Sequence, residues 1–336
     1  MGTRTKTKAR PLVVTVFGTR PQYIKLAVLW RELETAFRSV LIDSGQHYDW
    51  ELSGALQKDT GLRPPDVHLG VGSAAAAIQI GRVAERLDRH LTRLKPQAVV
   101  VIGDTSTTAG GAMAAAYRNV PVAHIEAGLR SFDRTAPEEK NRIIADQLST
   151  WRLCPTASAA RNLRNEGVRS GVYGVGDLMY EHWLDQHPRS RSASLPGGLH
   201  SGEYYYLTAH RAENVDHPAR LGQLIRVLET LDRPVIYPVH PRTRRNLSRL
   251  GLWGKLRRQS RLFLLPPVNY SNSLALIAGA KAVLTDSGGV QREAYWSGVP
   301  CLVLRNGRAL ACNRGCCVAR GIQLSRLCQG LVCHRL

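Results

Sequence analysis

The sequence has no apolar run approaching the roughly 20 residues that a membrane-spanning helix needs. The longest early run, PLVVTVFG (11–18), is too short for a secretory core and no small-residue cleavage pattern follows it. Apolar residues make up 43% of the chain and charged residues 21%, as in an ordinary globular protein. We therefore expect a cytoplasmic protein that does not enter a membrane.

Acidic residues are scarce, with 26 against 46 Lys and Arg, and lysine itself is rare. The net charge of +20 would favour nucleic-acid binding if it were clustered with aromatics, but the arginines are scattered. Residues 1–10 carry +4 and residues 305–336 carry +6 without any acid, which leaves +10 for residues 11–304. We expect no nucleic-acid partner; the body either suits an anionic substrate or reflects a bias toward Arg.

Cysteine is nearly absent from the body of the chain. Cys154 and Cys301 lie in apolar runs and are expected to be small core residues. The other five crowd the end of the chain, but without the paired C-x-x-C spacing of a zinc site, so no metal is expected. The G-x-G-x-x-A pattern in HLGVGSAA (68–75) has no buried strand before it and no suitable acid after it, so no nicotinamide or other cofactor is expected.

What the chain does have is a repeated strand–loop–helix pattern. Residues 98–104, AVVVIGD, form the continuous apolar run that a parallel sheet buries on both faces, while residues 20–37 and 218–231 have helical spacing. The alternation predicts an α/β protein with two Rossmann-like domains that face each other across a cleft. The expected parts are a disordered basic leader, an N-terminal domain, a linker, a C-terminal nucleotide-binding domain and an Arg/Cys-rich tail: residues 1–10, 11–183, 184–203, 204–304 and 305–336.

After Leu304 the pattern stops. The remaining segment shows no strand or helix that we can place and contains no acid. The second domain is therefore expected to be incomplete, with apolar strand surface left uncovered and its stability reduced.

Polar residues gather where the predicted strands end. Because the carboxyl ends of parallel strands share one edge of a sheet, these residues are expected to lie together in each domain. The stretch HIEAGLRSFDRTAPEEKNR (124–142) adds four carboxylates and four Lys or Arg side chains at one such end. Glu138 and Arg142 are four residues apart on a predicted helix, so Arg142 is expected to orient the Glu138 carboxylate.

Six motifs together resemble the non-hydrolysing UDP-N-acetylglucosamine 2-epimerase family. In chain order, between Val13 and Arg305, they are GTRPQYIKLA, DSGQHYDWELS, GDTSTT, HIEAGLRSFDRTAPEEKNR, TAHRAENVD and DSGGVQREAYWSGVPCLVLR. The resemblance implies a glycosyltransferase-B type fold and interconversion of UDP-N-acetylglucosamine and UDP-N-acetylmannosamine for cell-surface polysaccharide synthesis. It implies elimination of UDP to a 2-acetamidoglucal and its re-addition with the opposite configuration at carbon 2.

The resemblance also implies roles for individual residues. The acid–base groups would be Asp104, Glu126 and Glu138, with the base among them left open. His210 would belong to the catalytic set and would hold the departing diphosphate together with Arg20 and the turn Ser287, Gly288 and Gly289. Lys25 and Arg142 would orient the carboxylates or the sugar, Glu293 would bind the ribose hydroxyls, and Gln46 and His47 would contact a second, regulatory UDP-sugar.

Other functions fit the same motifs. One is the 2-epimerisation of a UDP-diacetamido uronic acid, and another is a retaining glycosyltransferase, which would leave the carboxylate loop without a use. A third is an inactive remnant that binds a UDP-sugar, because the tail departs from the family. The expected partners are a UDP-sugar substrate and a second copy of the chain in a homodimer.

Overall fold

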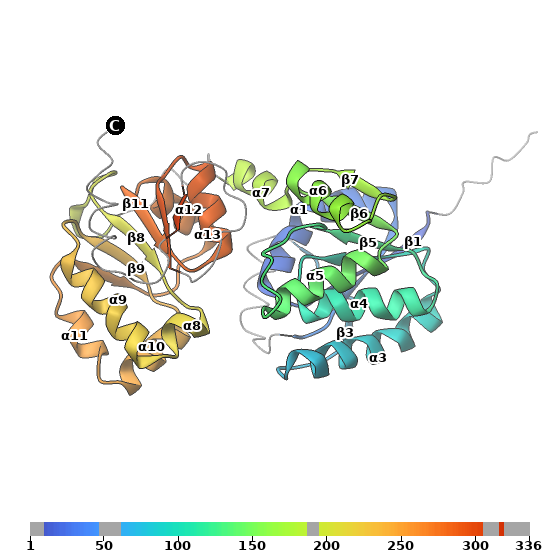
Figure 1. Ribbon diagram of the computed structural model, residues 1–336, viewed down its shortest axis with the longest axis horizontal. Coiled ribbons are helices and arrows are strands. Elements are labelled where there is room, and N and C mark those ends of the chain that lie inside the picture. The colour runs from blue at the N-terminus through green and yellow to red at the C-terminus, as the bar shows by residue number, and fades with distance from the viewer. Residues whose placement is uncertain (1–9, 47–61, 187–194, 305–315, 319–336) are drawn as a thin grey trace, which may run out of the picture. The chain divides into compact units, whose positions relative to one another are not determined.

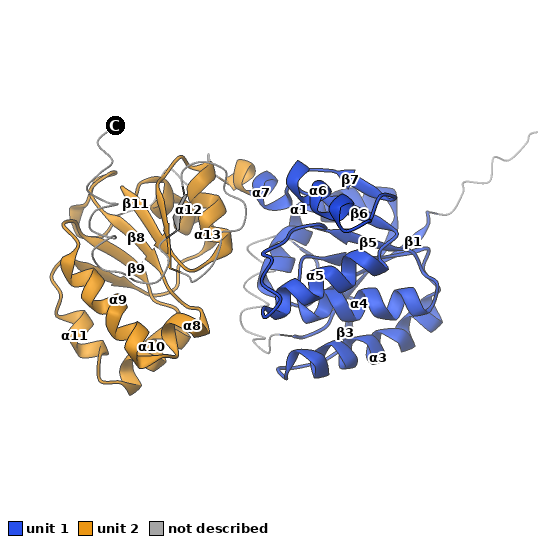
Figure 2. Cartoon of the chain, in the orientation of Figure 1, with its two compact units in different colours: residues 1–182 blue, residues 183–336 orange. Residues whose placement is uncertain are grey.

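The computed structural model describes residues 10–46, 62–186, 195–304 and 316–318, and these divide between two compact units, residues 1–182 and 183–336 (Figure 2). Helix α7 (Leu178–Gln186) runs across the boundary. The expected linker, residues 184–203, thus begins inside this helix; a short 3-10 turn, Pro196–Gly198, follows, and residues 187–194 lie outside the described part.

The first unit is built on a parallel sheet of seven strands in the order β3-β2-β1-β4-β5-β6-β7. Its strands are β1 (Leu12–Phe17), β2 (Arg38–Asp43), β3 (Val67–His68), β4 (Ala98–Ile102), β5 (Val122–Ile125), β6 (Trp151–Cys154) and β7 (Val172–Gly174). Its helices are α1 (Arg20–Ala36), α3 (Ala76–Leu94), α4 (Ser106–Tyr117), α5 (Pro137–Leu148), α6 (Ala157–Asn165) and the start of α7. The order of the first six strands is that of a doubly wound dinucleotide-type fold.

Helices cover both faces of this sheet (Figure 1). One face packs against α3, α4 and α5 and the other against α1, so every residue of β1 is buried. The small side chains of α4 let it approach α3 closely, since a Cβ at Gly110 would lie 2.7 Å from both the Ile80 carbonyl oxygen and the Val83 Cβ. The sequence prediction of a two-sided parallel sheet is confirmed for this unit.

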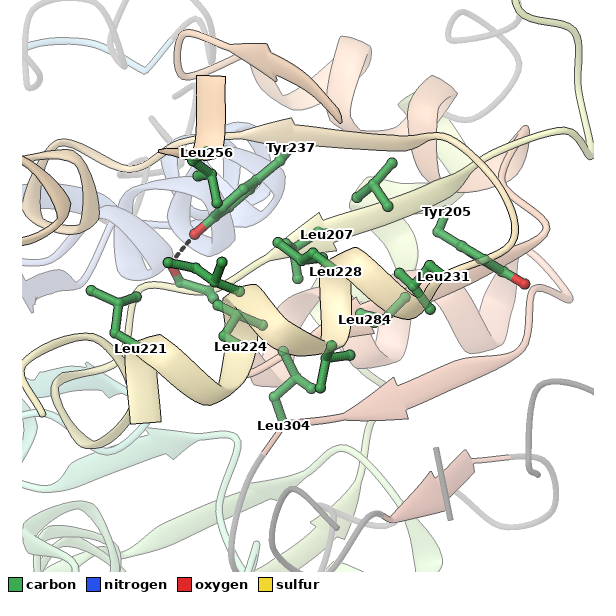
Figure 3. Close-up of a cluster of buried hydrophobic side chains, with 14 of the residues drawn as sticks. Tyr205, Leu207, Leu221, Leu224, Leu228, Leu231, Tyr237, Leu256, Leu284 and Leu304 are labelled. Carbon is green, nitrogen blue, oxygen red and sulfur yellow. Dashed lines mark hydrogen bonds between the residues drawn. The ribbon is translucent and has the colours of Figure 1, made fainter. Parts of the chain in front are cut away.

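The second unit repeats the arrangement with six parallel strands in the order β10-β9-β8-β11-β12-β13. Its strands are β8 (Tyr205–Thr208), β9 (Val235–Pro238), β10 (Leu262–Leu265), β11 (Ala282–Thr285), β12 (Cys301–Val303) and β13 (Cys316–Val318). Its helices are α8 (Ala212–Val215), α9 (Pro218–Thr230), α10 (Pro241–Arg249), α11 (Trp253–Arg257), α12 (Tyr270–Ala278) and α13 (Gly288–Trp296). The apolar face of α9 packs on one side of the sheet (Figure 3), and α12 and α13 pack on the other.

The structure corrects one expectation about the tail. Residues Cys316–Val318 form a strand that pairs in parallel with β12, whereas the sequence predicted no strand after Leu304. The segment is only three residues long and lies in Arg- and Cys-rich surroundings, so it carries no alternation that a sequence reading could detect. Its addition gives the second sheet its sixth strand, and the expected incompleteness of this domain is not confirmed. The rest of the tail lies outside the described residues.

No helix in the described part of the chain combines the length and the apolar character required to cross a bilayer.

Candidate active site

The first cluster of predicted site residues lies at the carboxyl edge of the first sheet, where β4 and β5 end. Lys25 of α1 forms an ion pair with Glu126, which follows β5, and both side chains are buried. The φ angle of Glu126 is +66°, a left-handed conformation that costs energy for a residue with a side chain. Because a buried charge needs a partner, Lys25 offsets the cost of holding the Glu126 carboxylate away from water.

Gly103 joins this pair to Asp104. Its φ angle is +71°, and a Cβ at this position would lie 3.4 Å from Glu126 Oε2 and 3.5 Å from Lys25 Nζ. The backbone of the β4 turn therefore lies directly against the ion pair, with Asp104 as the next residue. Glycine is needed here both for its conformation and for the close approach.

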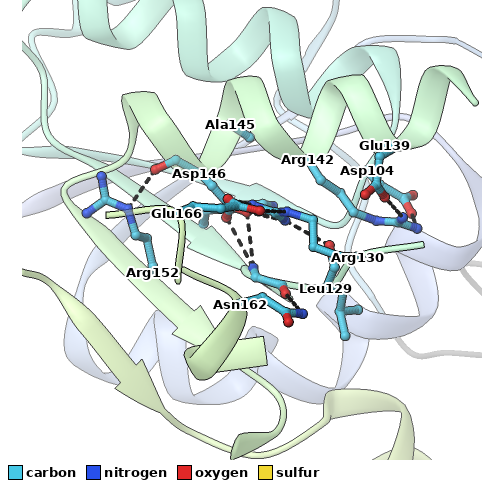
Figure 4. A network of polar contacts seen from close by, with 12 residues as sticks. Asp104, Leu129, Arg130, Glu139, Arg142, Ala145, Asp146, Arg152, Asn162 and Glu166 are labelled. Atoms are coloured by element: carbon cyan, nitrogen blue, oxygen red, sulfur yellow. Dashed lines mark hydrogen bonds and ion pairs between the residues drawn. The ribbon is translucent and has the colours of Figure 1, made fainter. Parts of the chain in front are cut away.

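Asp104 has its own cationic partner. Arg142 of α5 binds Asp104 Oδ2 through Nη2, and Asn141 Nδ2 donates to the Asp104 carbonyl oxygen at 3.0 Å (Figure 4). The Arg142 side chain is buried, whereas that of Asp104 is 33% exposed. The Asp104 carboxylate is thus anchored from the protein side and open to solvent on the other.

The structure corrects the expected partner of Arg142 on α5. Arg142 Nη1 binds Glu139 Oε2 at 3.0 Å, and no contact with Glu138 is recorded in the described residues. Glu139 also accepts hydrogen bonds from the backbone and hydroxyl of Ser131 at 2.8 and 2.9 Å and from the Phe132 amide at 3.0 Å. Burial acts to raise the pKa of Glu139, but these bonds and the Arg142 charge outweigh it and hold the pKa below its usual range.

Glu139 therefore ties the acidic loop to α5, a role that the sequence analysis missed. Spacings of three and four residues both place a carboxylate beside Arg142 on a helix, so the sequence offered no way to choose between Glu139 and Glu138. Glu138 itself is half-buried in the first turn of α5, where the helix dipole favours a negative charge. No hydrogen bond or ion pair of its side chain is recorded among the described residues, so it differs from the three paired carboxylates around it.

Arg20 and Gln46 lie at neighbouring strand ends of the same edge. Arg20 is the exposed first residue of α1, which Thr19 and Gln22 cap, and a helix start with an exposed guanidinium suits an anion. Gln46 Oε1 accepts from the Thr107 amide at 3.1 Å and from its hydroxyl at 2.8 Å, so it sits against the start of α4. His47 lies outside the described residues.

In the second unit the carboxyl edge is organised by Asp286, which follows β11 and is fully buried. Its Oδ2 accepts from the amides of His210 and Arg211 and from Asn214 Nδ2, each at 3.0 Å. These bonds fix the turn after β8, and with it the His210 ring, whose Nδ1 lies 3.5 Å from Asp286 Oδ1. Burial lowers the pKa of His210 in spite of the neighbouring carboxylate.

The predicted turn Ser287, Gly288 and Gly289 begins α13 next to this carboxylate. Ser287 is the N-cap, and the three residues are half-buried. The first amides of a helix have no partner inside it, and a glycine there leaves room for an anion to approach. Further along α13, Glu293 is buried, and burial raises its pKa to about 7 although Arg292 and a hydrogen bond from Tyr270 act in the other direction.

The predicted residues thus fall into two groups, one in each unit. In the first unit the structure brings together Lys25, Asp104, Glu126 and Arg142, with Glu138 beside Glu139. In the second it brings His210 and Ser287 together around Asp286. Asp286 closes the predicted strand in the sequence, but its role as the acceptor of three donors could not be read from it.

Comparisons with known proteins agree with this assignment of fold and motifs. The family model of UDP-N-acetylglucosamine 2-epimerase matches residues 31–324. A UDP-N-acetylglucosamine 2-epimerase homolog of Methanococcus maripaludis is 40% identical over 298 residues, which are 88% of this chain and 84% of the relative. A UDP-2,3-diacetamido-2,3-dideoxy-D-glucuronate 2-epimerase of Pseudomonas aeruginosa is 39% identical over 303 residues, 88% of this chain and 83% of the relative.

A solved structure is similar over almost the whole chain. It is the UDP-GlcNAc 2-epimerase of Methanocaldococcus jannaschii in complex with UDP-GlcNAc and UDP, with a TM-score of 0.84 and 33% identity, covering 95% of this chain and 91% of that one. The sequence resemblance, the doubly wound units and the paired carboxylates all lead to one assignment: this chain belongs to the UDP-N-acetylglucosamine 2-epimerase family.

Proposed function

We propose that this protein interconverts UDP-N-acetylglucosamine and UDP-N-acetylmannosamine by eliminating UDP and adding it back. The observation that carries the proposal is the pairing of Asp104 with Arg142 and of Glu126 with Lys25 around Gly103. The hydrogen on carbon 2 is not next to a carbonyl carbon, so its simple removal and return is too costly. Elimination of UDP avoids this, and it needs acid–base groups held beside carbon 2. Membership of the family and the substrates named for its relatives support the same reaction.

In the proposed mechanism a carboxylate removes the proton from carbon 2. The bond between carbon 1 and the UDP oxygen breaks, the electron pair leaves with UDP, and a 2-acetamidoglucal remains. UDP then adds back to carbon 1 while carbon 2 receives a proton on the opposite face. Asp104, Glu126 and Glu138 are the proposed acid–base groups. The partial exposure of Asp104, and a Glu138 side chain with no partner among the described residues, suit groups that meet a substrate.

The departing diphosphate must be held so that it can return. We assign this to Arg20, His210 and the amides at the start of α13, and the ribose hydroxyls to Glu293. Gln46 and His47 are the proposed contacts of a second, regulatory UDP-sugar. Lys25 and Arg142 orient the Glu126 and Asp104 carboxylates through the ion pairs described above.

The test is incubation of the purified chain with UDP-N-acetylglucosamine in deuterated water. Formation of UDP-N-acetylmannosamine with deuterium at carbon 2 of both sugars is the expected result. Release of UDP only when a sugar acceptor is added would indicate a transferase instead. A chain that binds UDP but neither exchanges hydrogen nor transfers sugar would be an inactive remnant.

A second candidate substrate is a UDP-diacetamido uronic acid. The Pseudomonas aeruginosa relative named for that sugar is 39% identical, against 40% for the UDP-N-acetylglucosamine 2-epimerase homolog, so overall similarity does not separate the two. An extra sugar carboxylate would need an extra cation, and none is identified. Comparison of kcat/KM for the two UDP-sugars decides between them.

Three further properties belong to the proposal. The chain is expected to act in the cytoplasm as a homodimer, and its product is expected to feed cell-surface polysaccharide synthesis. Nucleic acid is not an expected partner, since half of the +20 charge lies in the first 10 and last 32 residues. Sedimentation at several concentrations and a gel-shift assay at physiological salt test the dimer and the nucleic-acid expectation.

A further inference from the structure

A second buried network lies behind the first cluster and centres on His124 of β5, which is fully buried. Its Nε2 lies 2.7 Å from the Gly103 carbonyl oxygen, and its Nδ1 lies 2.7 Å from Asp146 Oδ1 on α5. Neither the sequence motifs nor the proposed chemistry gives this histidine a task. His124 contacts the turn that carries Asp104, but it is not among the residues proposed to bind or react with the substrate.

The hydrogen bonds show which ring nitrogen of His124 carries a hydrogen. A carbonyl oxygen can only accept, so Nε2 carries a hydrogen. Burial acts to raise the pKa of Asp146, but its contacts with His124 and Arg130 outweigh this and lower it, so Asp146 is a carboxylate that also accepts. Nε2 therefore donates to the Gly103 carbonyl, while Nδ1 faces the Asp146 carboxylate.

Further charges hold Asp146 in place (Figure 4). Arg130 Nη1 lies 2.7 Å from Asp146 Oδ2, and Arg130 in turn makes two bonds with Glu166, at 2.7 and 2.6 Å. The Gly128 amide donates to Asp146 Oδ2 at 3.1 Å. The result is a chain of alternating charges from Glu166, at the end of α6, to the ring of His124. Each buried charge has an opposite neighbour, which is the condition for such a network to persist.

The far end of this chain acts on the β4 turn. The Gly103 amide donates to the Ile125 carbonyl oxygen at 2.9 Å, and the Gly103 carbonyl accepts from His124, so β5 holds this glycine at both of its polar groups. Asp104 follows directly, and the Lys25–Glu126 pair lies within contact distance of Gly103. The orientation of one carbonyl thus sets where the Asp104 carboxylate and the ion pair stand relative to each other.

We propose that His124, held by Asp146, is a positioning residue for the epimerisation site. Its Nε2–H holds the Gly103 carbonyl and thereby places Asp104 beside Glu126. The inference rests on the proposed function for its catalytic consequence, but the positioning itself is a property of the fold. A displacement of about 1 Å in a reacting group can cost roughly a hundredfold in rate, so loss of this bond should appear in kcat more than in KM.

Two matched substitutions separate positioning from simple core stability. The amide nitrogen of His124→Gln can reach the place of Nε2 and donate to Gly103, while its link to Asp146 is lost. The amide of His124→Asn reaches only the place of Nδ1, so it keeps the Asp146 bond and loses the Gly103 bond. We expect His124→Asn to lower kcat about tenfold to a hundredfold with KM within about threefold of the native value. We expect His124→Gln to retain kcat within about threefold.

Loss of kcat in the Gln variant with retention in the Asn variant would overturn the proposal, because the Asp146 bond would then matter. Equal losses that follow equal falls in melting temperature would also overturn it and leave a structural role alone.

A readout without turnover separates failure of this inference from failure of the proposed function. Hydrogen exchange at the amides of Gly103 and Asp104 should be faster in His124→Asn than in the native chain and nearly unchanged in His124→Gln. Should neither variant fold, nitrogen-15 spectra of the native protein still decide the ring state. A hydrogen on Nε2 of His124 is expected, and a ring whose Nε2 carries no hydrogen would overturn the proposal.

Discussion

The six strands of the second unit follow the order of the first six strands of the first unit, but the two units carry different polar groups at their carboxyl edges. In the first unit the edge consists of side-chain ion pairs, with Lys25, Arg142 and His124 each beside a carboxylate. In the second it consists of backbone and amide donors collected by a single buried carboxylate, Asp286. The same doubly wound framework thus carries two different sets of polar groups at its strand ends.

The difference suits a division of labour. In the proposed reaction, proton transfer at carbon 2 needs acid–base groups held in place, and ion pairs hold the carboxylates of Glu126 and Asp104. In the proposed reaction, the nucleotide diphosphate and its ribose are held by the first amides of α13, by His210, whose pKa burial lowers, and by Glu293, whose pKa burial raises to about 7. The fold alone could not have shown which edge does which.

The largest expected effect tests the chemistry of the first edge. Asp104→Asn, Glu126→Gln and Glu138→Gln should each lower turnover by about a hundredfold or more, the scale of a lost acid–base group. UDP affinity, measured by calorimetry, should stay close to native, because the groups assigned to UDP are untouched. Glu85→Gln, an exposed change on α3, serves as the neutral control. Near-native turnover in all three variants would show that these carboxylates are not the acid–base groups of the reaction.

The outline of both edges could be predicted from the sequence because strand ends and their polar residues are local features. The run before Asp104 is apolar and continuous, the run before Glu126 is apolar except for His124, and they form β4 and β5 as expected. The sequence could not show which polar side chains at these edges are buried. Two adjacent glutamates at the start of α5 differ only in which way they face, and the helix period leaves both compatible with Arg142.

Long-range partners were equally hidden. Asp146 lies 22 residues from His124, and Glu166 lies 36 from Arg130, so no spacing rule connects them. They meet because β5 and the loop after it bring His124 and Arg130 to Asp146 on α5, and Arg130 also reaches Glu166 after α6. The strand at 316–318 was missed for a similar reason, since its pairing with β12 rather than its own pattern identifies it.

The next prediction concerns the pH dependence of stability that Glu293 gives to the second unit. Burial raises the pKa of Glu293 to about 7. A carboxyl with a raised folded pKa binds more protons in the native than in the unfolded state between about pH 4.5 and 7. Its contribution to stability is therefore present below that range and is lost as the pH rises through 7. The difference amounts to at most about 3 kcal/mol.

Glu293→Gln keeps the shape of the protonated form and should remove this pH dependence. Urea unfolding should find the two proteins alike near pH 5 and the native chain less stable than the variant near pH 8. A gap between them that is the same at both pH values would show that Glu293 does not titrate in this range.

The smallest expected effect concerns the residues proposed to hold the diphosphate of UDP. Arg20 belongs to the first unit and His210 to the second, so the two can be compared. Charge-assisted bonds to phosphate are among the stronger polar contacts, so Arg20→Ala and His210→Ala should each weaken UDP binding by about tenfold. Arg31→Ala and His200→Ala, exposed positions in the same two units, are the controls and should bind UDP as the native chain does.

Weaker UDP binding in both Arg20→Ala and His210→Ala means that the first unit shares in holding the diphosphate while its carboxylates move protons. If only His210→Ala binds more weakly, UDP recognition belongs to the second edge alone and Arg20 leaves the site. Unchanged affinity in both removes the two residues from the diphosphate and leaves the amides at the start of α13 as its holder.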